Sequence, residues 1–115
     1  MKTLPPHVDL SRQKAGTRVL LETTVGVWAL KLTDPVNVLV EVISTDPRFS
    51  HSAKPCVGQF VESSPPVGPH LKAPRFEKGK LVKGWMFSIR FADVILIAEP
   101  VQSIKVEGDD WSYEI

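Results

Sequence analysis

The chain has 115 residues, of which 43% are hydrophobic and 23% charged, and its formal net charge is +1. This composition excludes a globally disordered chain and a strongly basic or acidic one, and the length predicts a single domain over residues 1–115 with one core. The start, MKTLPPHVDLSRQK, lacks the apolar stretch of a signal peptide, and no window offers the run of about 18 apolar residues that a membrane span needs. With Cys56 as the single cysteine, no internal disulfide can form, and we expect a cytoplasmic protein.

The N-terminal part predicts an extended segment followed by a hairpin. Residues 1–16 are polar and contain prolines, so they offer at most a short helical turn. Residues 17–23 and 25–32 are rich in β-branched and apolar residues, and the short turn between them predicts two antiparallel strands. Within the second strand, the face that carries Trp28 and Leu30 is the expected core face.

Two Thr-Asp-Pro sequences bound the next predicted strand. They lie at 33–35 and 45–47, and both are turn signals because proline restricts the residue before it to extended or turn conformations. In residues 36–44, valine alternates with other residues, which predicts a strand whose valine face points inward. The valines of this face are Val36, Val38, Val40 and Val42. Residues 56–62 predict a further strand.

Residues 63–83 predict one long surface loop, because they combine prolines with serine, glycine and lysine. Within this loop, Pro66 and Pro69 have the spacing of PxxP ligands, which bind to aromatic grooves.

The strongest strand signal spans 84–91. Large apolar residues alternate there with Met86, Ser88 and Arg90, which predicts a strand with one uninterrupted core face. The residues of this face are Trp85, Phe87, Ile89 and Phe91.

Two strands are predicted after it. Residues 93–99 and 101–107 follow through short connections, which favour antiparallel returns. The last five residues could add one more short strand, which would pack Trp111 and Tyr113 against the core.

Six to seven short strands and no stretch of helical apolar spacing predict an all-β fold. For a chain of this length, we expect a small antiparallel barrel (SH3-like or similar) or a compact sandwich, because these folds leave few unpaired edge strands. The comparison with SH3-like barrels is one of architecture, and it identifies no family.

Charge is distributed unevenly along the chain. Residues 68–91 carry six basic and one acidic residue, whereas residues 92–115 carry one basic and six acidic residues. Such asymmetry arises either where neighbouring strands neutralise each other or where a basic patch binds a polyanion. In the second case, residues 72–83 would supply cations and one stacking ring for single-stranded nucleic acid. These candidate binding residues are Arg75, Phe76, Lys78, Lys80 and Lys83.

His51, Cys56 and His70 are weak candidates for a metal site or a Cys–His nucleophile. Their spacing matches no recurrent metal motif, and the alternative is two loop histidines and one half-buried strand cysteine. No phosphate-binding loop or nucleophile elbow is present in the sequence, so we assign no catalytic residue, no metal and no cofactor and do not expect an enzyme.

The sequence therefore favours a non-enzymatic protein-interaction or accessory module. We expect its binding surface at loop 63–83 and an adjacent sheet edge, where the partner is another protein or a second copy of this chain. Single-stranded nucleic-acid binding through 72–83 is the alternative, and no membrane partner is expected.

Overall fold

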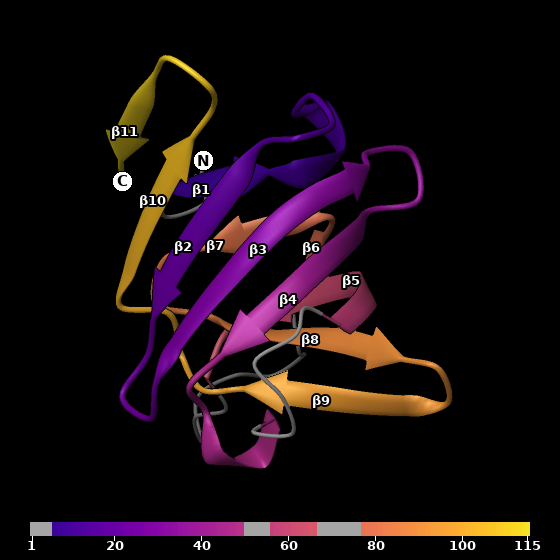
Figure 1. Ribbon diagram of the computed structural model, residues 1–115. Helices are drawn as coiled ribbons and strands as arrows, with labels where there is room; N and C mark the ends of the chain where they lie inside the picture. The colour runs from indigo at the N-terminus through magenta and orange to yellow at the C-terminus, as the bar shows by residue number, and fades with distance from the viewer. Residues whose placement is uncertain (1–5, 50–55, 67–76) are drawn as a thin grey trace.

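The computed structural model describes residues 6–49, 56–66 and 77–115 (Figure 1). These ranges hold eleven strands, two 3-10 helices and no α-helix, which confirms the predicted all-β class. No helix within them is long and apolar enough to cross a membrane. The strands are β1 (His7–Asp9), β2 (Arg18–Glu22), β3 (Val27–Asp34), β4 (Leu39–Ser44), β5 (Cys56–Ser64), β6 (Glu77–Lys78), β7 (Lys80–Val82), β8 (Met86–Phe91), β9 (Val94–Ala98), β10 (Ser103–Glu107) and β11 (Ser112–Glu114). The 3-10 helices are η1 (Leu10–Arg12) and η2 (Pro47–Phe49).

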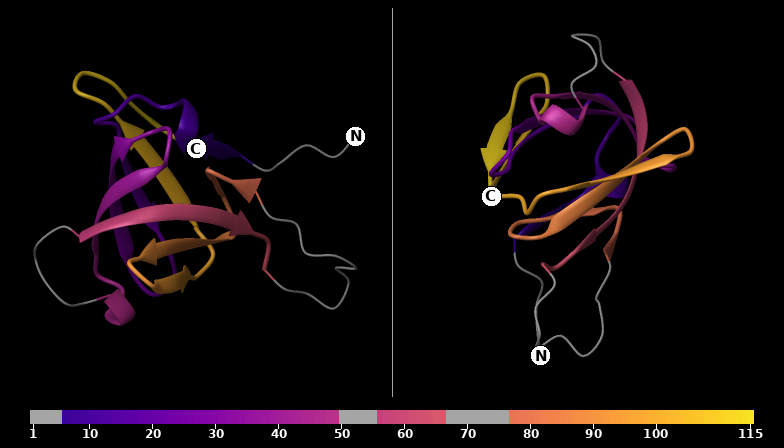
Figure 2. Two further views of the ribbon diagram at one scale, coloured as in Figure 1. Left: turned by 90° about the vertical axis from the view of Figure 1, so that its right-hand side faces the viewer. Right: turned by 90° about the horizontal axis from the view of Figure 1, so that it is seen from below.

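Nine strands form one antiparallel sheet in the order β11-β10-β2-β3-β4-β5-β8-β9, with β6 added to β5. The sheet curls around the interior of the molecule (Figure 2). A register shift between Phe60 and Glu62 in the long strand β5 helps it to bend, because a bulge increases the local twist. Among the described residues, β9 and β11 at the two ends of the sheet do not pair with each other, so the sheet is not a closed barrel.

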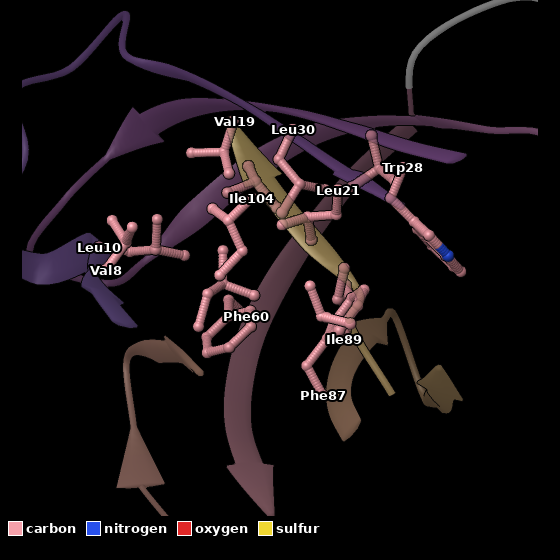
Figure 3. Packing of buried hydrophobic residues seen from close by; sticks show 14 of the residues in the cluster. Val8, Leu10, Val19, Leu21, Trp28, Leu30, Phe60, Phe87, Ile89 and Ile104 are labelled. Atoms are coloured by element: carbon pink, nitrogen blue, oxygen red, sulfur yellow. The ribbon is translucent and has the colours of Figure 1, made fainter. Parts of the chain in front are cut away.

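The core lies on the inner face of this sheet, where the two predicted core faces meet. Trp28 from β3 and Phe87 from β8 are almost completely buried, and their rings contact edge to face at 5.5 Å. Phe60 from β5 stacks on Phe87 at 6.1 Å (Figure 3). Burying one such side chain contributes about 1.5–3 kcal/mol. The alternation in 25–32 and 84–91 therefore predicted the inward faces correctly.

A second sheet of β1 and β7 covers one side of the core and lies behind β2 and β3 in Figure 1. Val8, Leu10 and Leu81 are buried there. The Leu10 amide donates to the Gly79 carbonyl at 2.7 Å, and this bond ties η1 to the turn between β6 and β7.

The structure differs from the sequence prediction in the number of strands and in the extent of the long loop. Eleven strands occur in the described ranges, whereas six to seven were predicted. The segment 1–16 contains β1, and both ends of the predicted loop 63–83 are strands, while 67–76 lie outside the described residues. The missed strands β1, β6 and β7 are two or three residues long, which is too short to show an alternating pattern.

The predicted inward position of Val36 is wrong, because β3 continues to Asp34 and Val36 lies exposed in the turn that follows. The Asp34 carboxylate organises this turn by accepting hydrogen bonds from the Val36 amide and from Asn37. The predicted packing of Trp111 and Tyr113 is also wrong. Their rings stack on each other at 5.8 Å, and each side chain remains 44% exposed.

Candidate functional site

Strand β9 forms one end of the large sheet and pairs only with β8 in the described part of the chain. Phe91 and Val94 flank a two-residue turn in which Ala92 has a φ of 52°, as in the primed turns of tight hairpins. Residues that flank such a turn form a hydrogen-bonded pair with each other. In an antiparallel ladder, hydrogen-bonded and non-hydrogen-bonded pairs alternate, so every second residue of β9 after Val94 also bonds to β8. The N–H and C=O groups of Ile95 and Ile97 therefore point away from β8, toward the free edge.

The side chains of β9 leave apolar groups exposed on both faces of the sheet at this edge. Val94, Ile95 and Ile97 are 59%, 50% and 57% exposed, whereas Ala98 is buried and Leu96 packs partly against the core. The register with β8 places Ile95 beside Arg90 and Ile97 beside Ser88 on the outer face of the sheet. An exposed apolar edge of this kind is a template for pairing with another chain.

An ion-pair network holds the C-terminal end of β9 against η2. The buried Asp46 carboxylate accepts a hydrogen bond from Arg48 Nη2 at 2.8 Å, and Arg48 Nη1 lies 3.9 Å from Glu99 Oε1, just after β9. The Arg48 hydrogen bonds also hold the pKa of Asp46 below its usual value, and Asp46 in turn raises that of Arg48. Because Arg48 and Glu99 are both about half exposed, their ion pair contributes little, and β9 is held mainly by its pairing with β8.

The opposite edge of the sheet offers less to a partner. Strand β11 has three residues, two of them serine and glutamate, and the Ile115 amide that follows it donates to the Ile104 carbonyl at 2.9 Å. Short and charged edges are disfavoured for pairing.

A groove of about 410 Å³ lies on the outer face of β10, β2, β3 and β4. Its floor is a cross-strand row in which Leu20 faces Ala29 and Ala29 faces Ile43. The next row is charged and includes the ion pair of Arg18 Nε with Glu107 Oε1 at 3.2 Å. Because these four strands are already paired on both sides, an occupant of the groove would gain side-chain contacts and no backbone hydrogen bonds.

The basic residues predicted as a binding patch do not form a set of unpaired cations. Lys80 Nζ lies 3.5 Å from Glu77 Oε2, and Lys83 Nζ donates to the main-chain oxygen of Ile115 at 3.1 Å. Lys78 is exposed on β6, next to β5. Arg75 and Phe76 lie outside the described residues, so the stacking ring of this prediction is not placed.

The three candidate metal or nucleophile residues are not brought together by the described part of the structure. Cys56 is exposed at the start of β5, so its predicted half-burial is wrong, and His51 and His70 lie outside the described ranges. No group of three or more histidine, cysteine or acidic side chains suited to a metal ion occurs among residues 6–49, 56–66 and 77–115.

Sequence reasoning did not single out β9 as a candidate site. The available signal was the apolar run from Val94 to Ala98, bounded by Asp93 and Glu99. A continuous apolar run usually indicates a strand buried on both faces, and only the sheet order shows that β9 is an edge.

Comparison of the chain with protein-family models, with curated proteins and with solved structures gave no match.

Proposed function

We propose that this protein is a non-enzymatic interaction module that binds an extended polypeptide by strand addition at β9. The observation that carries this proposal is the combination of outward backbone groups and exposed apolar side chains at Ile95 and Ile97. In strand addition, main-chain hydrogen bonds supply affinity and alternate side chains supply selectivity.

The partner segment is expected to be extended and apolar at alternate positions. Its outer-face side chains would pack beside Ile95 and Ile97, and cross-strand pairs of β-branched or aromatic residues each contribute roughly 0.2–1 kcal/mol. The pairing of β9 with β8 supports binding, because an edge strand that is already ordered loses little conformational entropy when the partner arrives.

Single-stranded nucleic-acid binding through Lys78, Lys80 and Lys83 ranks below strand addition. Two of these three lysines already have partners within the fold. A cation engaged in this way releases fewer counterions when it contacts a phosphate.

The experiment is selection of a random peptide library on the immobilised protein, followed by amide NMR with the enriched peptides. We expect the Ile95 and Ile97 amide resonances to shift, and we expect the amide of Ile43, on the outer face of β4, to stay in place. Peptides that instead perturb the groove around Ile43 would refute strand addition at β9.

Two substitutions at one position separate backbone pairing from side-chain contact. Ile97→Pro deletes an outward N–H without removing a β8–β9 hydrogen bond, since proline is compatible with the free side of an edge strand. Ile97→Thr keeps the N–H and the strand propensity but removes apolar surface. We expect a roughly tenfold loss of affinity for the proline variant, because one lost bond and the local ring clash together cost about 1.4 kcal/mol, and a smaller loss for threonine.

A further inference from the structure

We infer that the hairpin of β10 and β11 is a second interaction surface, where the rings of Trp111 and Tyr113 bind an arginine-rich segment of another protein. The hairpin lies at the opposite end of the sheet from β9 and extends to the upper left in Figure 1. A partner would contact its side chains, whereas strand addition at β9 uses backbone groups. The inference is therefore independent of the proposed function.

The aromatic pair is exposed but ordered. Trp111 directly precedes β11 and Tyr113 lies within it, and their rings are nearly parallel, with an interplanar angle of 16°. The indole of Trp111 also lies over Gly108, where an added Cβ would clash with it, and the Gly108 amide donates to the Trp111 carbonyl at 2.9 Å. Each aromatic side chain is nevertheless 44% exposed. Side chains that already have a fixed position lose little conformational entropy on binding, and tyrosine and tryptophan are enriched at protein interfaces.

The hairpin is also strongly acidic. Residues 107–114 carry four carboxylates and no lysine or arginine. The carboxylates are those of Glu107, Asp109, Asp110 and Glu114.

Two of these carboxylates have a cation beside them, and two do not. Glu107 Oε1 accepts a hydrogen bond from Arg18 Nε at 3.2 Å, and Glu114 lies opposite Lys105 in the register of β10 and β11. The carboxylates of residues 109 and 110 form no ion pair with residues 6–49, 56–66 or 77–115. The uncompensated negative charge therefore lies in the turn, immediately before Trp111.

The rings and the two free carboxylates together favour a guanidinium group as the occupant. Arginine stacks its planar side chain on aromatic rings, and its paired N–H groups bind carboxylates. A purely apolar segment would leave Asp109 and Asp110 without a counter-charge. The bases of a nucleic acid also stack on aromatic rings, but its phosphates would be repelled by the four carboxylates.

A single arginine is expected to bind weakly at this hairpin. Asp109, Asp110 and Trp111 are exposed, so water and salt screen the charges. A segment with several arginines contacts both rings and both aspartates at once, and its affinity should fall as salt is added.

The experiment is an amide NMR titration of the full chain with a hexapeptide of arginine and, separately, with a hexapeptide of lysine, which has the same charge. The amides of Gly108 and Tyr113 report binding at the hairpin, and those of Ile95 and Ile97 report binding at β9. We expect the arginine peptide to shift the Gly108 and Tyr113 amides and to bind at least about threefold more tightly than the lysine peptide, because lysine acts only as a point charge.

Two variants separate the contribution of the rings from that of the charges. Trp111→Leu keeps the carboxylates, and it should weaken binding of the arginine peptide at least about threefold and remove its advantage over the lysine peptide. Asp109→Asn combined with Asp110→Asn keeps the rings and should weaken binding of both peptides at low salt. All three side chains are exposed, so both variants are expected to fold.

Asp93→Asn combined with Glu22→Gln is the matched control, because it removes the same charge from exposed positions in the β8–β9 turn and at the end of β2. It should leave the affinity for both peptides nearly unchanged. Equal affinity of the wild-type protein for the two peptides, or an equal loss in the control variant, would show attraction by net charge alone and overturn the inference. Shifts at Ile95 and Ile97 without a shift at Gly108, or no binding at low salt, would overturn it as well.

Discussion

Replacing Asp46 by asparagine is expected to destabilise the fold, because this carboxylate is the buried centre of the network that joins η2 to β9. Its side chain is fully buried. It accepts hydrogen bonds from the Arg48 main-chain amide at 2.9 Å, from Arg48 Nε at 3.1 Å and from Arg48 Nη2 at 2.8 Å. Asparagine keeps the shape and one acceptor oxygen but loses the charge and the bidentate pairing.

The size of the effect follows from the exposure of the partner. Breaking a fully buried ion pair costs about 3–5 kcal/mol, but the Arg48 side chain is 44% exposed and water can solvate it after the substitution. We therefore expect Asp46→Asn to lower the free energy of unfolding by about 1–2 kcal/mol. For a domain of this length, that corresponds to a decrease in Tm of about 4–10 °C. Asp34→Asn, in an exposed turn, is the control and should have a smaller effect, since the turn is open to water.

Urea denaturation of both proteins as a function of pH tests the electrostatic origin of this difference. The pKa of Asp46 is lower in the folded state than in the unfolded chain, where an aspartate has a pKa of about 3.9. Its charge therefore stabilises the fold fully at pH values above the unfolded pKa, and this contribution is lost as pH falls through the folded pKa. The difference between wild type and Asp46→Asn should shrink below about pH 4. A difference that stays constant down to about pH 2 would show that the charge of Asp46 is not its source.

Two further predictions concern the packing of β5 and the alternative function. Gly58→Ala would place a Cβ 2.7 Å from Ile89 Cγ2 and 2.8 Å from Phe91 Cε1. Because Ile89 is fully buried, we expect the free energy of unfolding, measured by urea denaturation, to fall by about 1–2 kcal/mol. An unchanged or higher free energy of unfolding would show that the neighbouring core side chains move to make room for the added Cβ. Nucleic-acid binding through the basic segment predicts salt-dependent retention of single-stranded DNA in a filter assay, which should fall when Lys78 and Lys83 are replaced by glutamate. No retention of the wild-type protein at low salt would exclude this alternative.

Local alternation was sufficient to predict most strands and their buried faces. The period of two in 84–91 identified Phe87 and Ile89 as core residues, and the pattern in 25–32 did the same for Trp28. Val36 shows where this reasoning fails. Its alternation with later valines continued into a turn that Asp34 organises, and side-chain hydrogen bonds to the backbone outweighed the apolar pattern.

The candidate site depended on information that the local pattern does not contain. The amino-acid pattern alone indicates that Val94–Ala98 is an apolar strand bounded by two acidic residues. That this strand is an edge follows from the sheet order, in which the non-consecutive pairing of β10 with β2 and of β5 with β8 places β9 at one end. Alternation reports which face of a strand meets the core, whereas strand neighbours are set by long-range backbone hydrogen bonds that any residue except proline can make.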